Sequence, residues 1–218
     1  MLLAFDTSSP TVSVAVLGGR NEERGDEVLV ELTSEQEMRH GEQLAPLIEQ
    51  ALGQAGVSRF ELTAIGVGCG PGPFTGLRVG LVTARTLAAV LELPVYGVCS
   101  LDALAVQAVA SGVVEEPFVV ATDARRKEVY LAAYDERARR LSGPAVAKPD
   151  TVATDAPVVG EGALLYPEHF PRPVGPSRAS AGWLGRAIVH EAAELLDPEP
   201  LYLRRPDAEV PSARKPVS

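Results

Sequence analysis

Two turns in this sequence place an aspartate directly after an apolar run, where a carboxylate could hold a metal-bound water near a phosphate. The first turn, after residues 2–5, consists of Asp6, Thr7 and Ser8. The second, after residues 119–122, begins at Asp123. Small residues let the backbone approach phosphate, and a carboxylate can bind a cation there. The first turn therefore fits nucleotide binding, whereas Arg125 stands in the second turn where a glycine is needed.

The basic trio of the second turn, Arg125, Arg126 and Lys127, has two interpretations. It is either a solvated turn or a site for an anion, and the residues alone leave both open.

A glycine-rich motif is the most specific pattern in the chain. Residues 68–80 read GCGPGPFTGLRVG and lie between an apolar run and a helical pattern. Glycines and prolines at this density specify a particular backbone. The motif is neither a dinucleotide fingerprint nor a Walker A loop, because the third glycine comes one residue late and Leu77 replaces the lysine. The candidate loop residues are Gly70, Gly72, Thr75, Gly76 and Arg78.

Side chains that could bind a metal or attack a substrate are sparsely placed. His40, His169 and His190 form no H-x-x-x-H pair, and Cys69 and Cys99 form no C-x-x-C pair. The segment around Ser177 lacks the second glycine of a nucleophile elbow. We therefore predict no metal site, no catalytic residue and no cofactor bound by this chain independently.

Composition narrows the class of protein. The 218 residues are 46% hydrophobic and 22% charged, which is typical of a globular chain. Twenty Lys and Arg against 29 Asp and Glu give a net charge of −9, which disfavours a nucleic-acid binder acting alone. The N-terminus does not resemble a signal peptide, and no run has the length of a spanning segment. We expect a cytoplasmic protein without a membrane partner.

The apolar periodicity predicts an α/β fold. Strands are expected at residues 2–5, 12–17 and 27–32 as an antiparallel meander, then at 64–69 and 94–98. Helices are expected at 41–55, 75–91, 101–111 and 180–196. Helices alternating with short apolar strands favour a sheet with parallel members.

Residues 2–17 and 119–134 align at an offset of 117 residues, each as strand, acidic turn and strand. Either any hairpin with an Asp turn would align in this way, or the chain contains a duplicated domain. Duplication would divide the chain into an N-terminal lobe at 1–113 and a C-terminal lobe at 114–203. Residues 204–218 would form a flexible tail.

Four segments resemble the TsaB (YeaZ) family. They are LLAFDTSS, GPGPFTGLRVG, DARRKEVY and LYLR, and they extend from residue 2 to residue 204 in the family's order. Pro73 stands where the family typically has serine. The resemblance implies a two-lobed actin-like ATPase fold of duplicated βββαβα-type domains with a reduced second lobe. In it, Asp6, Thr7, Ser8 and Asp123 would be a vestigial phosphate loop.

The resemblance also implies a non-catalytic subunit. Such proteins pair with a TsaD-like paralogue that transfers a threonylcarbamoyl group to N6 of adenosine 37 in tRNAs reading ANN codons. ATP and metal would be used by partner subunits, with a TsaE-like ATPase and a TsaC-like synthase in the same pathway. The chain would meet tRNA through the complex and could form a homodimer when alone.

The expected partner surface is formed by the helices at 41–55 and 75–91, whose apolar residues extend around more than one face. The residues predicted to contact the partner are Leu44, Leu47, Ile48, Ala51, Gly76, Gly80, Leu81, Val82, Ala84 and Arg85. The alternative function is a small phosphotransferase of the same fold, similar to pantothenate kinase, because the Asp6 turn fits either reading.

Overall fold

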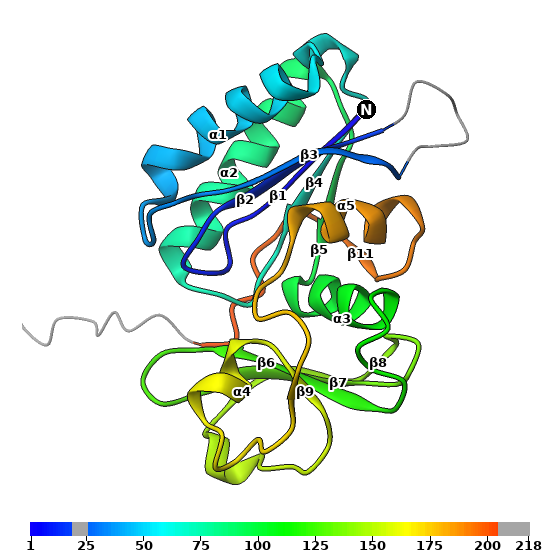
Figure 1. The fold of residues 1–218 in the computed structure, drawn as a ribbon. Coiled ribbons are helices and arrows are strands. Elements are labelled where there is room, and N and C mark those ends of the chain that lie inside the picture. The colour runs from blue at the N-terminus through cyan, green and yellow to red at the C-terminus, as the bar shows by residue number, and fades with distance from the viewer. Residues whose placement is uncertain (19–25, 205–218) are drawn as a thin grey trace, which may run out of the picture.

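The computed structural model describes residues 1–18 and 26–204, which form two mixed sheets with helices on and between them (Figure 1). Apart from Arg204, the predicted tail at 204–218 lies outside the described residues. The α/β class expected from the sequence is confirmed.

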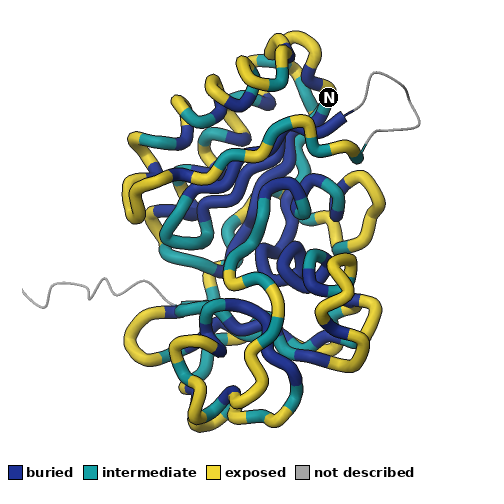
Figure 2. The backbone as a smooth tube through the Cα atoms, in the orientation of Figure 1, coloured by how far each residue is buried: buried dark blue, intermediate teal, exposed yellow. Residues whose placement is uncertain are grey.

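The first sheet has the strand order β11-β5-β4-β1-β2-β3. Its strands are β1 (Leu2–Asp6), β2 (Ser13–Leu17), β3 (Val28–Thr33), β4 (Ala64–Gly68), β5 (Val95–Val98) and β11 (Leu195–Leu196). The first three form the predicted meander, and β4 and β5 continue the sheet parallel to β1. β1 and β2 are buried along their whole length, because helices cover both faces of the sheet (Figure 2).

Helices α1 (His40–Ala55) and α2 (Phe74–Leu91) cover one face of this sheet. Helix α5 (Ala181–Val189) covers the other face and packs on α3 (Ser100–Ala110). A short 3-10 helix, η2 (Arg59–Glu61), lies between α1 and β4. All four predicted helices exist, although the last ends at Val189 instead of residue 196.

The second sheet has the strand order β10-β9-β6-β7-β8. Its elements are β6 (Phe118–Asp123), β7 (Val129–Tyr134), β8 (Arg140–Ala147), β9 (Val158–Val159) and β10 (Pro173–Val174), with η3 (Pro149–Thr151) and α4 (Glu161–Leu165) between strands. The sequence missed β8, because Gly143 and Pro144 read as a loop. A proline is tolerated there because β8 is an edge strand.

Helix α3 lies between the two sheets. Leu101 and Leu104 share one apolar cluster with Val120 and Tyr134 of the second sheet. The shared core explains why α3 is buried on nearly all sides, including the polar side chain of Asp102.

The end of the chain corrects the assignment of residues 114–203 to one lobe. Leu184 and Ile188 of α5 pack with Leu2 and Leu17 of the first sheet, and β11 pairs with β5. A Cβ at Gly185 would lie 2.4 Å from the Leu17 side chain, so a glycine lets α5 approach the strands closely. The division into lobes therefore follows the sheets, and the chain returns to the first sheet after the second.

Helix α2 is long and apolar enough to cross a membrane by length and composition alone, contrary to the sequence expectation. In this structure it packs against β4 and α1, with Leu77, Leu81 and Ala84 buried. Core helices of soluble proteins can have the same length and composition.

Candidate functional site

The carboxylate of Asp6 is fully engaged by its own chain. Oδ1 accepts hydrogen bonds from the Ser8 backbone N–H at 2.7 Å and from the Ser8 hydroxyl at 2.5 Å. Oδ2 accepts one from the Ser100 hydroxyl at 2.5 Å. The residue is 2% exposed, and neighbouring Thr7 is fully buried and donates to the Gly76 carbonyl at 2.8 Å. Both oxygens that could have faced a bound cation therefore hold the turn in shape.

The glycine-rich segment packs on this turn. A Cβ at Gly68 would lie 1.9 Å from the Asp6 carboxylate, and one at Gly72 would lie 2.4 Å from the Ser8 carbonyl oxygen. At Gly76 and Gly80 the corresponding contacts are with Thr7, at 2.5 and 2.3 Å. The glycines therefore permit close contact between two parts of the same chain. Gly76 and Gly80, which the sequence predicted to contact a partner, pack against Thr7 of this chain instead.

The remaining residues of the loop have different environments. Gly70 has a φ of +90°, and its carbonyl accepts from the backbone N–H of Ser100 at 2.7 Å. Thr75 is exposed in the first turn of α2. Arg78 lies in α2, and its guanidinium contacts the Phe74 ring and the Tyr202 hydroxyl.

A cleft separates the Asp6 turn from the Asp123 turn. It is lined by Ser8, Ser9, Pro10, Pro71, Pro73, Ser100, Leu101, Leu104, Thr122, Asp123, Arg125, Glu161, Ser177, Arg178 and Ala179. The free space is about 20 Å³, which holds a water molecule and not a nucleotide. The structure brings the two predicted turns to one cleft, but side chains fill it.

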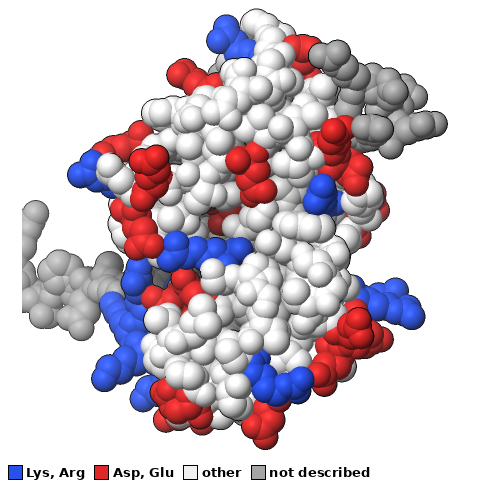
Figure 3. All heavy atoms as spheres, in the orientation of Figure 1, with Lys and Arg blue, Asp and Glu red and all other residues white. Residues whose placement is uncertain are grey.

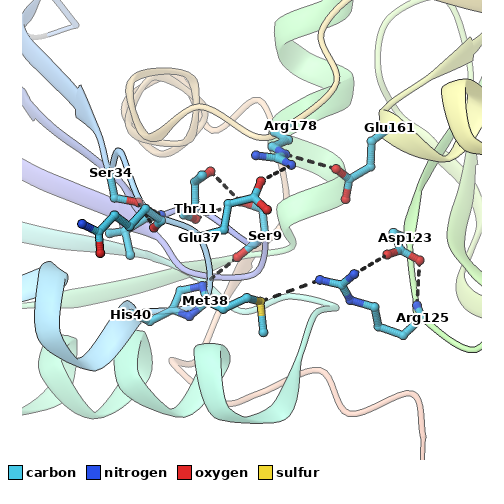
Figure 4. A network of polar contacts seen from close by, with 12 residues as sticks. Ser9, Thr11, Ser34, Glu37, Met38, His40, Asp123, Arg125, Glu161 and Arg178 are labelled. Atoms are coloured by element: carbon cyan, nitrogen blue, oxygen red, sulfur yellow. Dashed lines mark hydrogen bonds and ion pairs between the residues drawn. The ribbon is translucent and has the colours of Figure 1, made fainter.

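Arg178 spans the mouth of this cleft. Its guanidinium donates to Glu37 at 2.9 Å and to Glu161 at 3.1 Å (Figure 4). Glu37 precedes α1, and Glu161 begins α4 below the second sheet. Burial opposes the charged form of Arg178, but the two carboxylates outweigh it and raise its pKa. The cation thus joins the two halves of the molecule at all ordinary pH values.

The second turn has an unusual backbone. Arg125, Arg126 and Lys127 have φ values of 60°, 56° and 60°, a left-handed conformation that disfavours residues with a Cβ. Asp123 accepts from the Arg125 backbone N–H at 2.8 Å and pairs with the Arg125 guanidinium at 3.2 Å. From the sequence we expected a glycine in this turn. The positive φ values would suit glycine, although the residues present are cations.

The two cysteines are buried thiols. Burial raises the pKa of Cys69 to about 12, and it raises the pKa of Cys99 to about 12 as well. Thiolates are therefore scarce at neutral pH. Within residues 1–18 and 26–204, no group of three or more His, Cys, Asp or Glu side chains is arranged to hold a metal ion.

The structure corrects most of the predicted partner surface. Leu44, Ile48, Ala51, Gly76, Gly80, Leu81 and Ala84 are buried within this chain. They face the first sheet or its turns, because the apolar stripe of each helix is used to cover β1–β4. Leu47 is partly buried, whereas Val82 and Arg85 are exposed, with Arg85 paired to Glu199. The outer face of α2 also exposes Val90, 74% of whose surface is open to solvent.

Sequence reasoning missed Ser100, Arg178 and the segment 197–204. Ser100 could have been found, because it follows a strand parallel to β1 and the carboxyl ends of parallel strands meet at one edge of a sheet. Arg178 carried no signal, since its two partners are distant in sequence. Tyr202 lies in the LYLR segment, but it stacks on Phe74 only because the end of the chain folds back onto the first half of the molecule.

A family model described as TsaD, tRNA N6-adenosine threonylcarbamoyltransferase, matches residues 27–192. An uncharacterized protein of Mycobacterium tuberculosis is 40% identical over 211 residues, covering 95% of this chain and 93% of that protein. The tRNA threonylcarbamoyladenosine biosynthesis protein TsaB of Haemophilus influenzae is 37% identical over 131 residues, covering 60% of this chain and 52% of that protein.

Among solved structures, YeaZ from Pseudomonas aeruginosa matches with a TM-score of 0.72 and 31% identity. The match covers 93% of this chain and 99% of that chain. The fold is therefore shared across nearly the whole chain.

Proposed function

Because the chain belongs to the TsaB (YeaZ) family, we propose that it is a non-catalytic subunit of the machinery for tRNA threonylcarbamoyladenosine biosynthesis. It would dimerise with a TsaD-like catalytic subunit, which adds the threonylcarbamoyl group to N6 of adenosine 37 in tRNAs that read ANN codons. One observation carries this proposal. The cleft beside the Asp6 turn is filled by side chains of this chain, and the Asp6 carboxylate accepts its hydrogen bonds from Ser8 and Ser100.

The filled cleft supports a structural role for the Asp6 turn. A phosphotransferase needs room for a nucleotide between its two turns and a carboxylate free to hold the metal. Here the cleft has about 20 Å³ of free space, and both Asp6 oxygens accept hydrogen bonds from serines. These features disfavour the alternative, a pantothenate-kinase-like phosphotransferase. ATP and metal would act in the partner subunits.

The proposed partner surface is the outer face of α2 with the adjoining side of α1. Val82 is 59% exposed and Val90 is 74% exposed, and Leu47 of α1 is partly buried. Exposed apolar residues on one helix face are a common feature of protein interfaces. The same surface would serve a homodimer when the partner is absent.

Membership of the TsaB (YeaZ) family also supports the other proposed components of the pathway. A TsaE-like ATPase and a TsaC-like synthase would act in the same pathway, and tRNA would bind to the assembled complex. The proposed compartment is the cytoplasm, where tRNA is modified.

The test is association with a TsaD-like protein, measured by copurification and calorimetry. Val82→Glu should weaken association at least about tenfold, because it places a charge in an apolar contact while leaving the fold intact. The matched control is Leu164→Glu, since Leu164 on α4 is 63% exposed and lies on the other half of the molecule. It should leave association unchanged.

Two results would contradict the proposal. One is unchanged association of the Val82→Glu variant. The other is turnover by the isolated chain, as threonylcarbamoyl transferase, kinase or peptidase, that disappears in an Asp6→Ala variant shown to be folded.

A further inference from the structure

A second cavity lies on the side of the molecule where the chain returns past the glycine-rich loop. It has about 400 Å³ of free space, within the range of small-molecule sites. Among the described residues it is lined by Gly72, Pro73, Phe74, Asp123, Ala124, Arg125, Arg126, Tyr130, Leu201, Tyr202, Leu203 and Arg204. Neither the Asp6 turn nor the exposed face around Val82 contributes to it.

One wall of this cavity is aromatic. The rings of Phe74 and Tyr202 stack with centroids 4.9 Å apart, and each residue is 40% exposed. Arg78 lies over the Phe74 ring at 3.7 Å and donates to the Tyr202 hydroxyl at 3.1 Å. Contacts with α2 therefore hold the stack in place before any ligand arrives, and part of each ring stays open to solvent.

Another part of the lining is cationic. Arg125 and Arg126 project from the left-handed turn, and Arg204 approaches from the returning segment, where it donates to the Ala124 carbonyl at 2.9 Å. Asp123 pairs with Arg125, and Glu128 pairs with Arg204. The lining thus contains three arginines and one carboxylate, Asp123, in a chain whose net charge is −9. Figure 3 shows a group of Lys and Arg side chains at the left edge of the lower half of the molecule, with acidic side chains spread over both halves of the visible face.

Exposed aromatic rings beside arginines suit a nucleotide unit, whose base stacks on rings and whose phosphate binds guanidinium groups. We propose that this cavity binds one unpaired nucleotide of the tRNA substrate, with the base on the Phe74–Tyr202 stack and the phosphate at Arg125 and Arg126. The inference rests on the proposed function, which supplies an RNA. Stacking reads no sequence, so this contact would add affinity and orientation without choosing the tRNA.

The test uses the full chain, alone and with its TsaD-like partner. A short single-stranded oligoadenylate is titrated into the chain alone by nuclear magnetic resonance, and unmodified tRNA into the complex by fluorescence anisotropy. Tyr202→Ala should weaken both interactions about tenfold, because the stacked base loses its ring. Tyr202→Phe keeps the ring and should bind as the unmodified chain does.

The matched control is Phe60→Ala. Phe60 is 76% exposed and has Arg59 at 4.8 Å over its ring, so it is also an exposed aromatic residue with an arginine, but it lies on η2 outside the cavity. Its loss should leave binding unchanged. Arg126→Ala should reduce the slope of log affinity against log salt by about 0.7, the value for one phosphate contact of a single strand.

Unchanged RNA binding by a folded Tyr202→Ala variant would overturn the proposal. A second pair of results would also overturn it. Adenosine monophosphate would bind as tightly as the oligoadenylate, and Tyr202→Ala would abolish that binding while leaving tRNA binding intact. The cavity would then bind a free nucleotide. The oligoadenylate titration needs no partner, so it decides this point even if the chain fails to associate with a TsaD-like protein.

Discussion

The hairpins β1–β2 and β6–β7 share strand order and antiparallel pairing, yet their acidic turns have opposite environments. Asp6 is buried, and its carboxylate accepts hydrogen bonds from two serines of its own half of the chain. Asp123 is partly exposed and pairs with Arg125 of its own turn. The first turn is covered by the glycine-rich segment, whereas the second faces a cavity of about 400 Å³.

The registers of the two hairpins also differ. Asp6 pairs with Ser13, and Asp123 pairs with Val129, so the second turn is one residue shorter than the offset of 117 residues requires. The shorter turn closes through three left-handed residues, and two of them, Arg125 and Arg126, line the cavity. The same strand–Asp–strand pattern is thus packed inside the molecule in β1–β2, whereas in β6–β7 it forms part of a charged surface. Three pairs of variants test this difference.

The largest effect is expected at Gly68, where β4 touches the Asp6 carboxylate. Gly68→Ala should lower the free energy of unfolding by about 3 kcal/mol or more, because a Cβ would lie 1.9 Å from Oδ2 with no room to move away. Urea denaturation measures the change. Gly53→Ala is the control: no atom lies within 4 Å of its Cβ position in α1, so alanine should stabilise the helix slightly. Equal effects at the two glycines would refute the close packing described here.

A smaller difference should separate the two aspartates. Asp6→Ala should cost about 2 to 4 kcal/mol, because it leaves the Ser8 backbone N–H and the buried Ser100 hydroxyl without their acceptor. Asp123→Ala removes a partly exposed ion pair and should cost about 1 kcal/mol or less. Thermal unfolding of both variants at neutral pH makes the comparison. If Asp123→Ala proved as costly as Asp6→Ala, the second turn would also be a packing element.

The smallest effect concerns the strained turn. Lys127→Gly should raise the free energy of unfolding by about 0.5 to 1 kcal/mol, because glycine adopts a φ of 60° without a Cβ clash while its freer unfolded chain offsets part of the gain. Lys127→Ala keeps the Cβ and should give no such gain. Denaturant midpoints of the two variants, measured in the same salt, separate strain from charge. A gain shared by both would point to relief of charge repulsion among the three cations.

The sequence determined the element order through most of the chain. Apolar runs and three- and four-residue spacing correctly predicted β1 to β5, the helices α1 to α3 and the hairpin β6–β7, since local periodicity reflects which face each element buries. It also identified both acidic turns and the glycine-rich loop, because glycine and proline restrict the backbone locally. The short strands β9, β10 and β11 carried no such pattern, since each pairs over only two residues.

Tertiary structure alone decided what those residues do. Gly76 and Gly80 were predicted to contact a partner, and the fold packs them, together with Gly68 and Gly72, against residues 6–8 of the same chain. Apolar residues of α1 and α2 suggested a partner, and most of them cover the first sheet instead. The returning segment brings Tyr202 to Phe74 and Arg204 to Ala124 across more than 70 positions of sequence. Such contacts follow from how packed elements meet in space, and no local pattern encodes them.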